Sequence, residues 1–316
     1  MKKPKIITHR SNIARLFATN ILWTKKSLLT VVFAVIILLP ILAQNKRALI
    51  VGISLYNPHN IKSSEMWNNI HGANDAKLIK ETLRKQGFKI NTIEDSKATA
   101  QNIRNAFYKL IQETQSGDLV YIHFSGHGQA VEDINGDESD GWDEAIIPID
   151  ANPEYSPELY KGGNHILDDE LHEFFRSLRK KIGPQGIVYA IIDACHAGSI
   201  YRGDEVEDTI YARGTNKGFT FSGKRYSPRI DKRGNILVEK GEKLSDITII
   251  EACRSYEVNT EIKQNGEYFG PLSYYVHKVL STHSLSKDTV WSRIVANLMD
   301  MDKRLIKQHV VIETTK

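Results

Sequence analysis

The stretch GIVYAIIDACHAGS, residues 186–199, predicts the centre of the fold. Residues 187–192 form an unbroken apolar run rich in β-branched side chains, which is typical of a strand buried on both faces of a parallel sheet. The run ends at DACHAG, residues 193–198, and open α/β sheets place ligands and chemistry at such strand ends. Cys195, one of two cysteines in the chain, lies there. Taken alone, it is equally well explained as a small buried hydrophobe.

A second stretch of the same kind makes a catalytic cysteine the better interpretation. The apolar run DLVYIHF, residues 118–124, ends in the glycine turn SGHG, residues 125–128. If the two runs are neighbouring parallel strands, His127 and Cys195 lie on the same edge of the sheet. Histidine is the usual base that turns a cysteine thiol into the nucleophilic thiolate.

Strands and helices alternate along the rest of the chain. We expect strands at 47–54, 89–94, 247–250 and within 309–316, and helices at 76–86, 98–113, 170–181, 270–281 and 289–306. Asn74 or Asp75 is a natural cap for the first helix. The alternation predicts βαβ units and a mostly parallel sheet in an α/β protein. With 41% hydrophobic residues, the chain has enough apolar material for one large domain.

The first 43 residues predict export across a membrane. Residues 1–26 are basic without any acidic residue, and residues 27–43 are almost wholly apolar. This apolar core is short for a membrane span, which needs roughly 20 residues, and suits a signal peptide cleaved after Ala43. An uncleaved N-terminal anchor is the alternative. Either way the domain at 46–316 lies outside the cytoplasm, as a periplasmic, extracellular or membrane-anchored protein.

Carboxylates are concentrated in EDINGDESDGWDE, residues 132–144. Its D-x-N-x-D spacing is like that of a calcium-binding EF-hand loop, but Glu138 stands where that loop requires glycine for a sharp turn. Carboxylates this close repel one another unless water or a cation lies between them. The stretch is therefore either a solvated acidic loop or a cation site.

Residues 198–245 form a long stretch with little periodicity, rich in Gly, Ser, Tyr and basic residues. Segments of this kind in compact domains are functional or disordered. One interpretation is a flexible surface excursion with a hairpin near residues 233–235. The other is a loop that the protein cleaves itself, which we infer from its basic residues: Arg202, Arg213, Lys217, Lys224, Arg225, Arg229, Lys232 and Arg233.

Four motifs in order resemble those of the caspase-like cysteine peptidases of family C14, and the metacaspases more than the animal caspases. They are SGHG at 125–128, DINGDESDGWDE at 133–144, ILDDEL at 166–171 and DACHAGS at 193–199. The resemblance implies a caspase-like sandwich, in which helices flank both faces of a mostly parallel central sheet. It also implies a cysteine-type endopeptidase with a Cys-His dyad, here Cys195 and His127.

Cys253 is the rival nucleophile. Its surroundings EACRS, residues 251–255, are similar to the QACRG signature of caspases. We rank it second because no glycine turn follows it and because the metacaspase pattern assigns the nucleophile to Cys195. If the strands that carry the two cysteines are neighbours, the sulfurs approach disulfide distance in an oxidising compartment.

The chemistry follows from the dyad. Cys195 attacks a peptide carbonyl, while His127 takes its proton and later protonates the leaving amine. The backbone N–H groups of Gly128 and Cys195 are the expected donors to the oxyanion.

The expected specificity follows from charge. Animal caspases line their first pocket with arginine and cleave after aspartate, whereas this chain offers carboxylates there. Carboxylates select cationic side chains and bind arginine through two hydrogen bonds. We therefore expect protein or peptide substrates that are cleaved after Arg or Lys, in a pocket lined by Asp75, Ser125 and Asp193.

The resemblance also implies a calcium site. Metacaspases build one from an acid in the acidic loop, an Asp-Asp pair before the next helix and an acid after the nucleophile. Carried over to this sequence, the ligands are Asp143, Asp168, Asp169 and Asp204. Asp168 is also a good N-cap for the helix that follows. Clustered carboxylates suit Ca²⁺, and we expect no organic cofactor.

Two other classes of function stay open. A metal-dependent hydrolase is conceivable because His123 and His127, four residues apart on one strand, would share a face. However, His123 is more simply explained as packed in its strand, and no Cys/His ligand spacing supports zinc. The other class is a catalytically silent binding protein on the same fold.

The small net charge of +4, partly N-terminal, predicts no nucleic-acid partner. We expect a monomer that meets a membrane only through its N-terminal segment.

Overall fold

The computed structural model describes residues 44–56, 66–195, 211–228, 230, 235–238 and 240–315. The basic and apolar segments predicted at 1–26 and 27–43 lie outside these residues, as does Asp204. The compact unit begins at residue 45, one position before the predicted start of the domain. Among the helices of the described part, none has the length and apolar character needed to cross a membrane.

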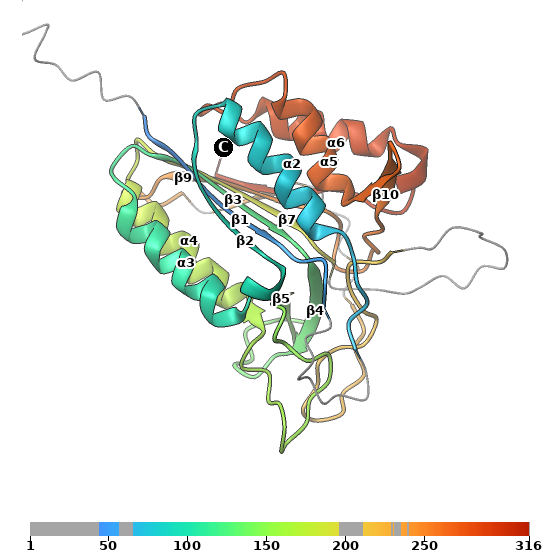
Figure 1. The fold of residues 1–316 in the computed structure, drawn as a ribbon. Coiled ribbons are helices and arrows are strands. Elements are labelled where there is room, and N and C mark those ends of the chain that lie inside the picture. Colours follow the sequence, from blue (N-terminus) through green and yellow to red (C-terminus); the bar gives the residue numbers. More distant parts are fainter. Residues whose placement is uncertain are drawn as a thin grey trace, which may run out of the picture. The chain divides into compact units, whose positions relative to one another are not determined.

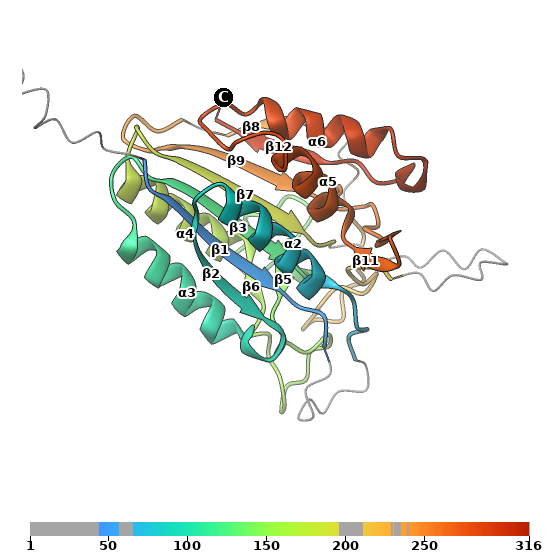
Figure 2. The same cartoon turned by 45° about the horizontal axis from the view of Figure 1, so that its top comes forward.

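A seven-stranded sheet forms the middle layer, in the order β2-β1-β3-β7-β9-β12-β8, as Figure 2 shows. Its strands are β1 (Lys46–Gly52), β2 (Lys89–Glu94), β3 (Leu119–Ser125), β7 (Ile187–Asp193), β8 (Asn235–Leu237), β9 (Asp246–Glu251) and β12 (Val311–Thr314). All neighbours are parallel except β9 and β12. The two apolar runs form the central strands β3 and β7, buried along their whole length. The predicted α/β class with a mostly parallel sheet is confirmed.

Helices cover both faces of the sheet (Figure 1). One face carries α2 (Gly72–Lys85), α5 (Pro271–Leu280) and α6 (Val290–Asp300). The other carries α3 (Ala100–Glu113) and α4 (Asp168–Ile182). Short 3₁₀ turns lie at η1 (Asp95–Lys97) and η2 (Lys303–Leu305). Each face of the sheet therefore has its own apolar core, which explains why its central strands are hydrophobic at every position.

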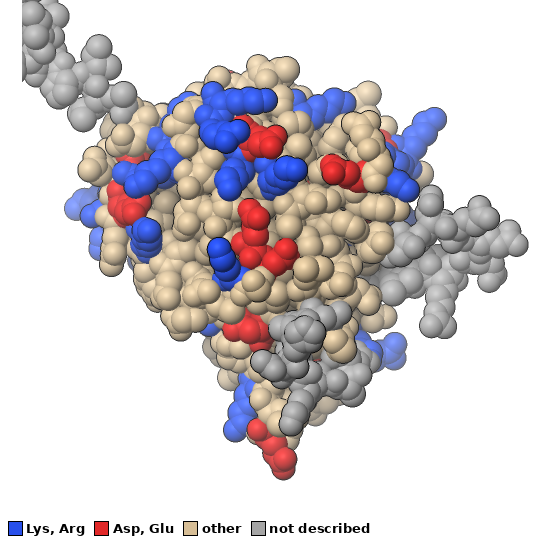
Figure 3. Space-filling model, viewed as in Figure 1, with Lys and Arg blue, Asp and Glu red and all other residues tan. Residues whose placement is uncertain are grey.

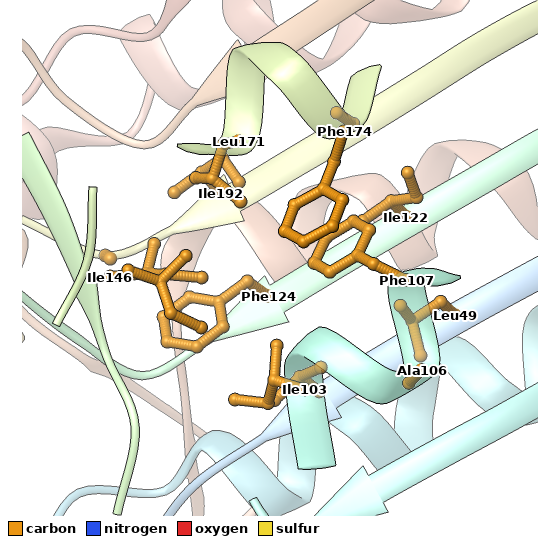
Figure 4. Close-up of a cluster of buried hydrophobic side chains, with 14 of the residues drawn as sticks. Leu49, Ile103, Ala106, Phe107, Ile122, Phe124, Ile146, Leu171, Phe174 and Ile192 are labelled. Atoms are coloured by element: carbon orange, nitrogen blue, oxygen red, sulfur yellow. The ribbon is translucent and has the colours of Figure 1, made fainter. Parts of the chain in front are cut away.

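The core between the sheet and the α3–α4 layer is packed around aromatic rings (Figure 4). Phe107 of α3 stacks on Phe174 of α4, with centroids 4.7 Å apart and an interplanar angle of 8°. Leu49, Ile122 and Ile192, from three adjacent strands, form the sheet side of the same cluster. This stacking joins α3 and α4 into one layer that covers this face of the sheet.

Two small sheets were not predicted. One is antiparallel and consists of β4 (His127–Glu132), β5 (Trp142–Ile147) and β6 (Ile166–Leu167). The other is the hairpin of β10 (Ile262–Gln264) and β11 (Glu267–Phe269). β6, β10 and β11 have only two or three residues, and β4 and β5 contain glycine or acidic residues and lack a clear period, so nothing in the sequence distinguished these strands from loops. His127, which was expected in a turn, is the first residue of β4.

The predicted helix caps are wrong. The N-cap of α2 is His71 and that of α4 is Leu167, so Asn74, Asp75 and Asp168 all lie inside their helices. The two carboxylates accept hydrogen bonds from groups outside their own helices instead. These longer-range partners override the local capping preference.

Charged side chains of both signs lie close together on the face shown in Figure 3. Lys89 and Glu113 form an exposed ion pair with Nζ and Oε2 3.1 Å apart. Exposed pairs of this kind contribute little to stability, so the stability of the domain rests on its two cores.

Replacing Phe107 with alanine should lower the free energy of unfolding by about 3–5 kcal/mol, because the deletion leaves a cavity beside Phe174. Urea denaturation followed by circular dichroism measures the change. Met301→Ala is the control, since that side chain is 78% exposed and its loss should cost less than about 0.5 kcal/mol. Equal destabilisation by the two variants would contradict this account of the core.

Candidate active site

The register of β3 and β7 brings the predicted dyad to one edge of the sheet. Ser125 and Asp193, the last residues of the two parallel strands, are paired directly. His127 and Cys195 each follow two residues later, and both are buried. The register therefore places the histidine and the cysteine that follow the two apolar runs at the same edge of the sheet.

His127 is held as a neutral imidazole. Its Nε2 lies 2.8 Å from the backbone oxygen of Asn68, and because a carbonyl only accepts, this nitrogen carries the proton. Nδ1 is buried and has no hydrogen-bond partner among the described residues. Burial lowers the pKa of His127 to about 4. Nδ1 therefore has a lone pair that can accept a proton.

Two aromatic residues fix the ring of His127. Trp67 stacks on it with centroids 5.0 Å apart, and the Tyr56 ring is 4.5 Å away. The Tyr56 hydroxyl accepts from the backbone N–H of His127 at 2.8 Å and donates to the oxygen of Ile147 at 3.0 Å. The sequence did not predict that Trp67 and Tyr56 contact His127, because no local sequence pattern indicates a contact between residues 60 or more positions apart.

The two cysteines lie in one buried cluster, and no disulfide joins them. Cys195 Sγ donates to the backbone oxygen of Glu257 at 2.8 Å, and Cys253 Sγ lies 3.8 Å from the same oxygen. A hydrogen bond with Cys195, together with burial, raises the pKa of Cys253 well above its ordinary value. Since the thiolate is the nucleophile, this environment disfavours Cys253 as the attacking group.

Arg213 fills an acidic pocket, and its side chain is completely buried. Nη2 lies 2.7 Å from Asp75 Oδ2 and 2.7 Å from Glu261 Oε1. Nη1 lies 3.7 Å from Asp193 Oδ1 and donates to Ser125 Oγ at 2.5 Å. Asp75, Ser125 and Asp193, the three residues predicted to line a pocket for a basic side chain, are thus brought together. Glu261 was not predicted.

The electrostatics of this pocket favour a cation. Burial raises the pKa of Asp75 to about 7 although Arg213 opposes the shift. Burial would also lower the pKa of Arg213, but the carboxylates around it raise the pKa overall. At Glu261 the effect of burial is outweighed by Arg213 and His71, which lower its pKa. Carboxylates buried without a cation would be costly.

Residues after β9 position the acidic groups. Asp193 accepts from Asn259 Nδ2 and from the backbone N–H and hydroxyl of Ser273, each at 2.7 Å. Gly270 leaves the necessary space, because a Cβ there would collide with Asp193 Oδ2 and with Arg213 Nη1. A glycine and a serine at the start of α5 carried no signal of this role in the sequence.

The main chain before Arg213 is bound as an extended strand. Arg213 N donates to the oxygen of Asn259 at 2.9 Å, and Glu261 N donates to the oxygen of Tyr211 at 2.9 Å. Ala212 and Thr260 form the antiparallel bridge between these bonds. This is strand addition, the usual way in which an extended peptide binds to an exposed edge.

The carbonyl oxygen of Arg213 lies where an oxyanion was expected. It accepts from the backbone N–H of Gly128 at 3.1 Å and from that of Cys195 at 3.0 Å. Gly214 follows so closely that a Cβ there would collide with the oxygen of Cys195. The two predicted oxyanion donors therefore bind the carbonyl of a peptide bond that follows a basic residue.

Beyond Gly214 the segment runs along β4. Gly214 forms a bridge with Gly128. Phe219 N donates to the oxygen of Ala130, and Glu132 N donates to the oxygen of Phe219, both at 2.8 Å. The peptide bond between residues 213 and 214 is thus anchored on both sides.

Three carboxylates converge in the acidic loop. One oxygen each of Asp133, Asp137 and Asp143 lies within 4.8 Å of the others. Burial raises the pKa of Asp143 to about 7, and the nearby carboxylates of Asp168 and Asp169 add to the shift. Crowded carboxylate oxygens with unbalanced charge fit a hard cation such as Ca²⁺.

The other predicted calcium ligands lie beside this group or outside the described part. Asp168 Oδ1 accepts from the backbone N–H of Glu144 at 3.2 Å. Asp169 Oδ2 accepts from Asn135 Nδ2 at 2.9 Å. Asp204 lies outside the described residues.

The histidine pair of the metal-dependent hydrolase does not form a ligand cluster. The ring nitrogens of His123 lie 3.2 Å from the Tyr121 hydroxyl and 3.0 Å from Ser273 Oγ, and burial lowers its pKa to about 4. Within the described ranges, the group of residues that could hold a metal includes neither His123 nor His127. His123 is a packed, hydrogen-bonded core histidine.

Comparison with known proteins agrees with the motifs. Residues 46–202 match the family model of the metacaspase, peptidase C14 domain. Metacaspase-1 of Eremothecium gossypii is 34% identical over 165 residues, which are 49% of this chain and 32% of that protein. The chain therefore spans about a third of the length of this relative.

A solved structure shares the fold. Protein GSU0716 from Geobacter sulfurreducens superposes with a TM-score of 0.57 and 19% identity, over 85% of this chain and 93% of that one. The Drosophila initiator caspase Dronc matches over 84% of this chain and 78% of its own, with a TM-score of 0.42 and 12% identity. The chain thus contains a peptidase C14 domain of the metacaspase family, with the caspase-like fold that its motifs predicted.

Proposed function

We propose that this protein is a cysteine endopeptidase that cleaves after arginine or lysine. One observation carries the proposal: the buried side chain of Arg213 fills the acidic pocket while its carbonyl oxygen accepts from the N–H groups of Gly128 and Cys195. The pocket and the donors thus bind a basic residue and its peptide bond at the same time. Membership of the C14 peptidases supports the same chemistry.

The proposed reaction uses the tautomer that Asn68 fixes. Nδ1 of His127 takes the proton of Cys195, and the thiolate attacks the peptide carbonyl carbon. The Gly128 and Cys195 N–H groups stabilise the oxyanion. The C–N bond then breaks as His127 protonates the leaving amine. Water, activated by His127, hydrolyses the thioester and restores the thiol.

The pocket should prefer arginine to lysine. The guanidinium of Arg213 meets Asp75 and Glu261 through one nitrogen and Ser125 through the other. The ammonium group of lysine is a single charged nitrogen, so it cannot contact the two carboxylates and the serine hydroxyl from two separate positions as the guanidinium does. An aspartate side chain would add a fourth carboxylate to the pocket, which like-charge repulsion opposes.

Calcium is proposed as an activator because the acidic loop touches the segment that fills the site. Lys224 Nζ lies 3.1 Å from the oxygen of Gly141 and 5.1 Å from the centre of the Trp142 ring. Trp142 also packs closely against Gly218. A cation held by Asp133, Asp137 and Asp143 would add positive charge to the loop whose backbone oxygens bind the Lys224 ammonium group, and so weaken the attachment of this segment.

We also propose, from the basic residues 1–26 and the apolar residues 27–43, that the domain acts outside the cytoplasm.

The activity is tested with the full-length chain, a reductant, and fluorogenic peptides that end in Arg, Lys or Asp. We expect turnover of the Arg peptide, slower turnover of the Lys peptide and none of the Asp peptide. Cys195→Ala should lower turnover by at least about a thousandfold, because no other group supplies the nucleophile. Cys253→Ala is the matched control and should stay active. Turnover by the Cys195 variant, or a preference for Asp, would refute the proposal.

Self-cleavage is expected between Arg213 and Gly214, because this bond already lies on the oxyanion donors. Mass spectrometry of the purified chain should find a fragment that ends at Arg213. Arg213→Gln should prevent this cut, whereas Arg225→Gln, a change at an exposed arginine of the same segment, should not. A cut at this bond in the Cys195→Ala chain would show that another protease makes it.

Asp143→Asn should weaken Ca²⁺ binding at least about tenfold and abolish stimulation of peptide turnover by Ca²⁺, because it removes the most buried carboxylate of the group. Calorimetric titration with CaCl₂ measures the affinity directly. Glu173→Gln, at an exposed acid on α4, is the control. If the unchanged protein gives no binding heat, the calcium proposal fails without affecting that for the peptidase.

A further inference from the structure

We propose that the active site has a second specificity pocket, formed by His71 and Tyr268, that binds an aromatic side chain two residues before the basic residue. This inference rests on the proposed peptidase function and adds a second requirement to its substrates. The preferred sequence is aromatic-x-Arg, with cleavage after the arginine. In the chain itself, that sequence is Tyr211-Ala212-Arg213.

Three rings meet at this pocket. The Tyr211 ring stands edge-on to His71, with centroids 4.8 Å apart at 88°, and to Tyr268, with centroids 5.0 Å apart at 69°. His71 and Tyr268 stack on each other at 5.1 Å and 23°. These distances and angles are those of favourable aromatic pairs. An aliphatic or small side chain in place of Tyr211 would lose both of the edge-on contacts.

The two rings that form the pocket are held by groups other than Tyr211. His71 Nδ1 lies 2.5 Å from Glu261 Oε2, and its backbone N–H donates to Oε1 at 2.8 Å. Asn74 Nδ2 donates to the backbone oxygen of Tyr268 at 3.1 Å, and Lys263 Nζ lies over the Tyr268 ring at 5.2 Å. The pocket is therefore built into the domain and does not depend on the segment that fills it.

The strand geometry explains why the first and third residues are recognised together. Side chains two apart in an extended strand point to the same side. The hydrogen bonds of Tyr211 and Arg213 to Glu261 and Asn259 fix this register, so both side chains enter the site. Glu261 joins the two pockets, because one of its oxygens binds the guanidinium and the other the His71 ring.

The kinetic test compares reporter peptides acetyl-Tyr-Ala-Arg and acetyl-Ala-Ala-Arg. We expect kcat/KM to be about tenfold higher for the tyrosine peptide. In Tyr268→Leu this ratio should fall to about two, and in Tyr268→Phe it should stay near ten because the ring remains. Tyr108→Leu, at an exposed tyrosine on α3, is the control and should keep the ratio. A ratio near one in the unchanged protein would overturn the inference.

A binding test separates this inference from the proposed catalysis. Cys195→Ala, Tyr211→Ala and Arg213→Ala together remove the nucleophile and the two side chains that fill the pockets. Calorimetry with acetyl-Tyr-Ala-Arg-amide and acetyl-Ala-Ala-Arg-amide should then give about tenfold tighter binding of the first. A tenfold ratio without turnover by the unchanged protein would remove the peptidase but keep the pocket. Equal affinities would overturn the pocket whatever the activity.

Discussion

A buried guanidinium among three carboxylates is the interaction on which the active site depends. Asp75 comes from α2, Asp193 from the end of β7 and Glu261 from the loop after β9, and Arg213 joins them. Each of these charges would be costly to bury alone, and losing one partner of such a pair typically costs about 3–5 kcal/mol. The pocket therefore requires a cation, and three distant parts of the chain are tied together when it has one.

Because the pocket requires a cation of any origin, the arginine of another peptide could take the place of Arg213. When Arg213 leaves, the carboxylates lose their counter-ion, and an arginine from another peptide restores the same ion pairs and the same hydrogen bonds. Under the proposed function, the chain's own segment and an arginine substrate would therefore compete for the pocket through the same contacts. What favours the segment is its covalent attachment, which gives it a high effective concentration. Cutting the chain after Arg213 would remove this advantage on one side of the bond.

The sequence was sufficient where the signal was local. Two apolar runs predicted β3 and β7, and their parallel pairing brings His127 and Cys195 to one edge. It was insufficient where a role depends on contacts between distant positions. Asn68, Asn259 and Glu261 act through a backbone carbonyl or through partners more than 45 residues away, and no spacing rule reveals such pairs.

The loop after Cys253 links the separate parts of the site. Every second residue of this loop contacts a different part of the site. The backbone oxygen of Glu257 accepts from the thiol of Cys195. Asn259 hydrogen-bonds to Asp193 and to the backbone of Arg213, and Glu261 binds the Arg213 guanidinium. A thiol has one proton, so donation to Glu257 and transfer to His127 exclude each other. A movement of this loop that turned the thiol towards His127 would also shift the groups that bind Arg213. The contacts that hold the thiol away from His127 and those that hold Arg213 therefore come from the same short loop.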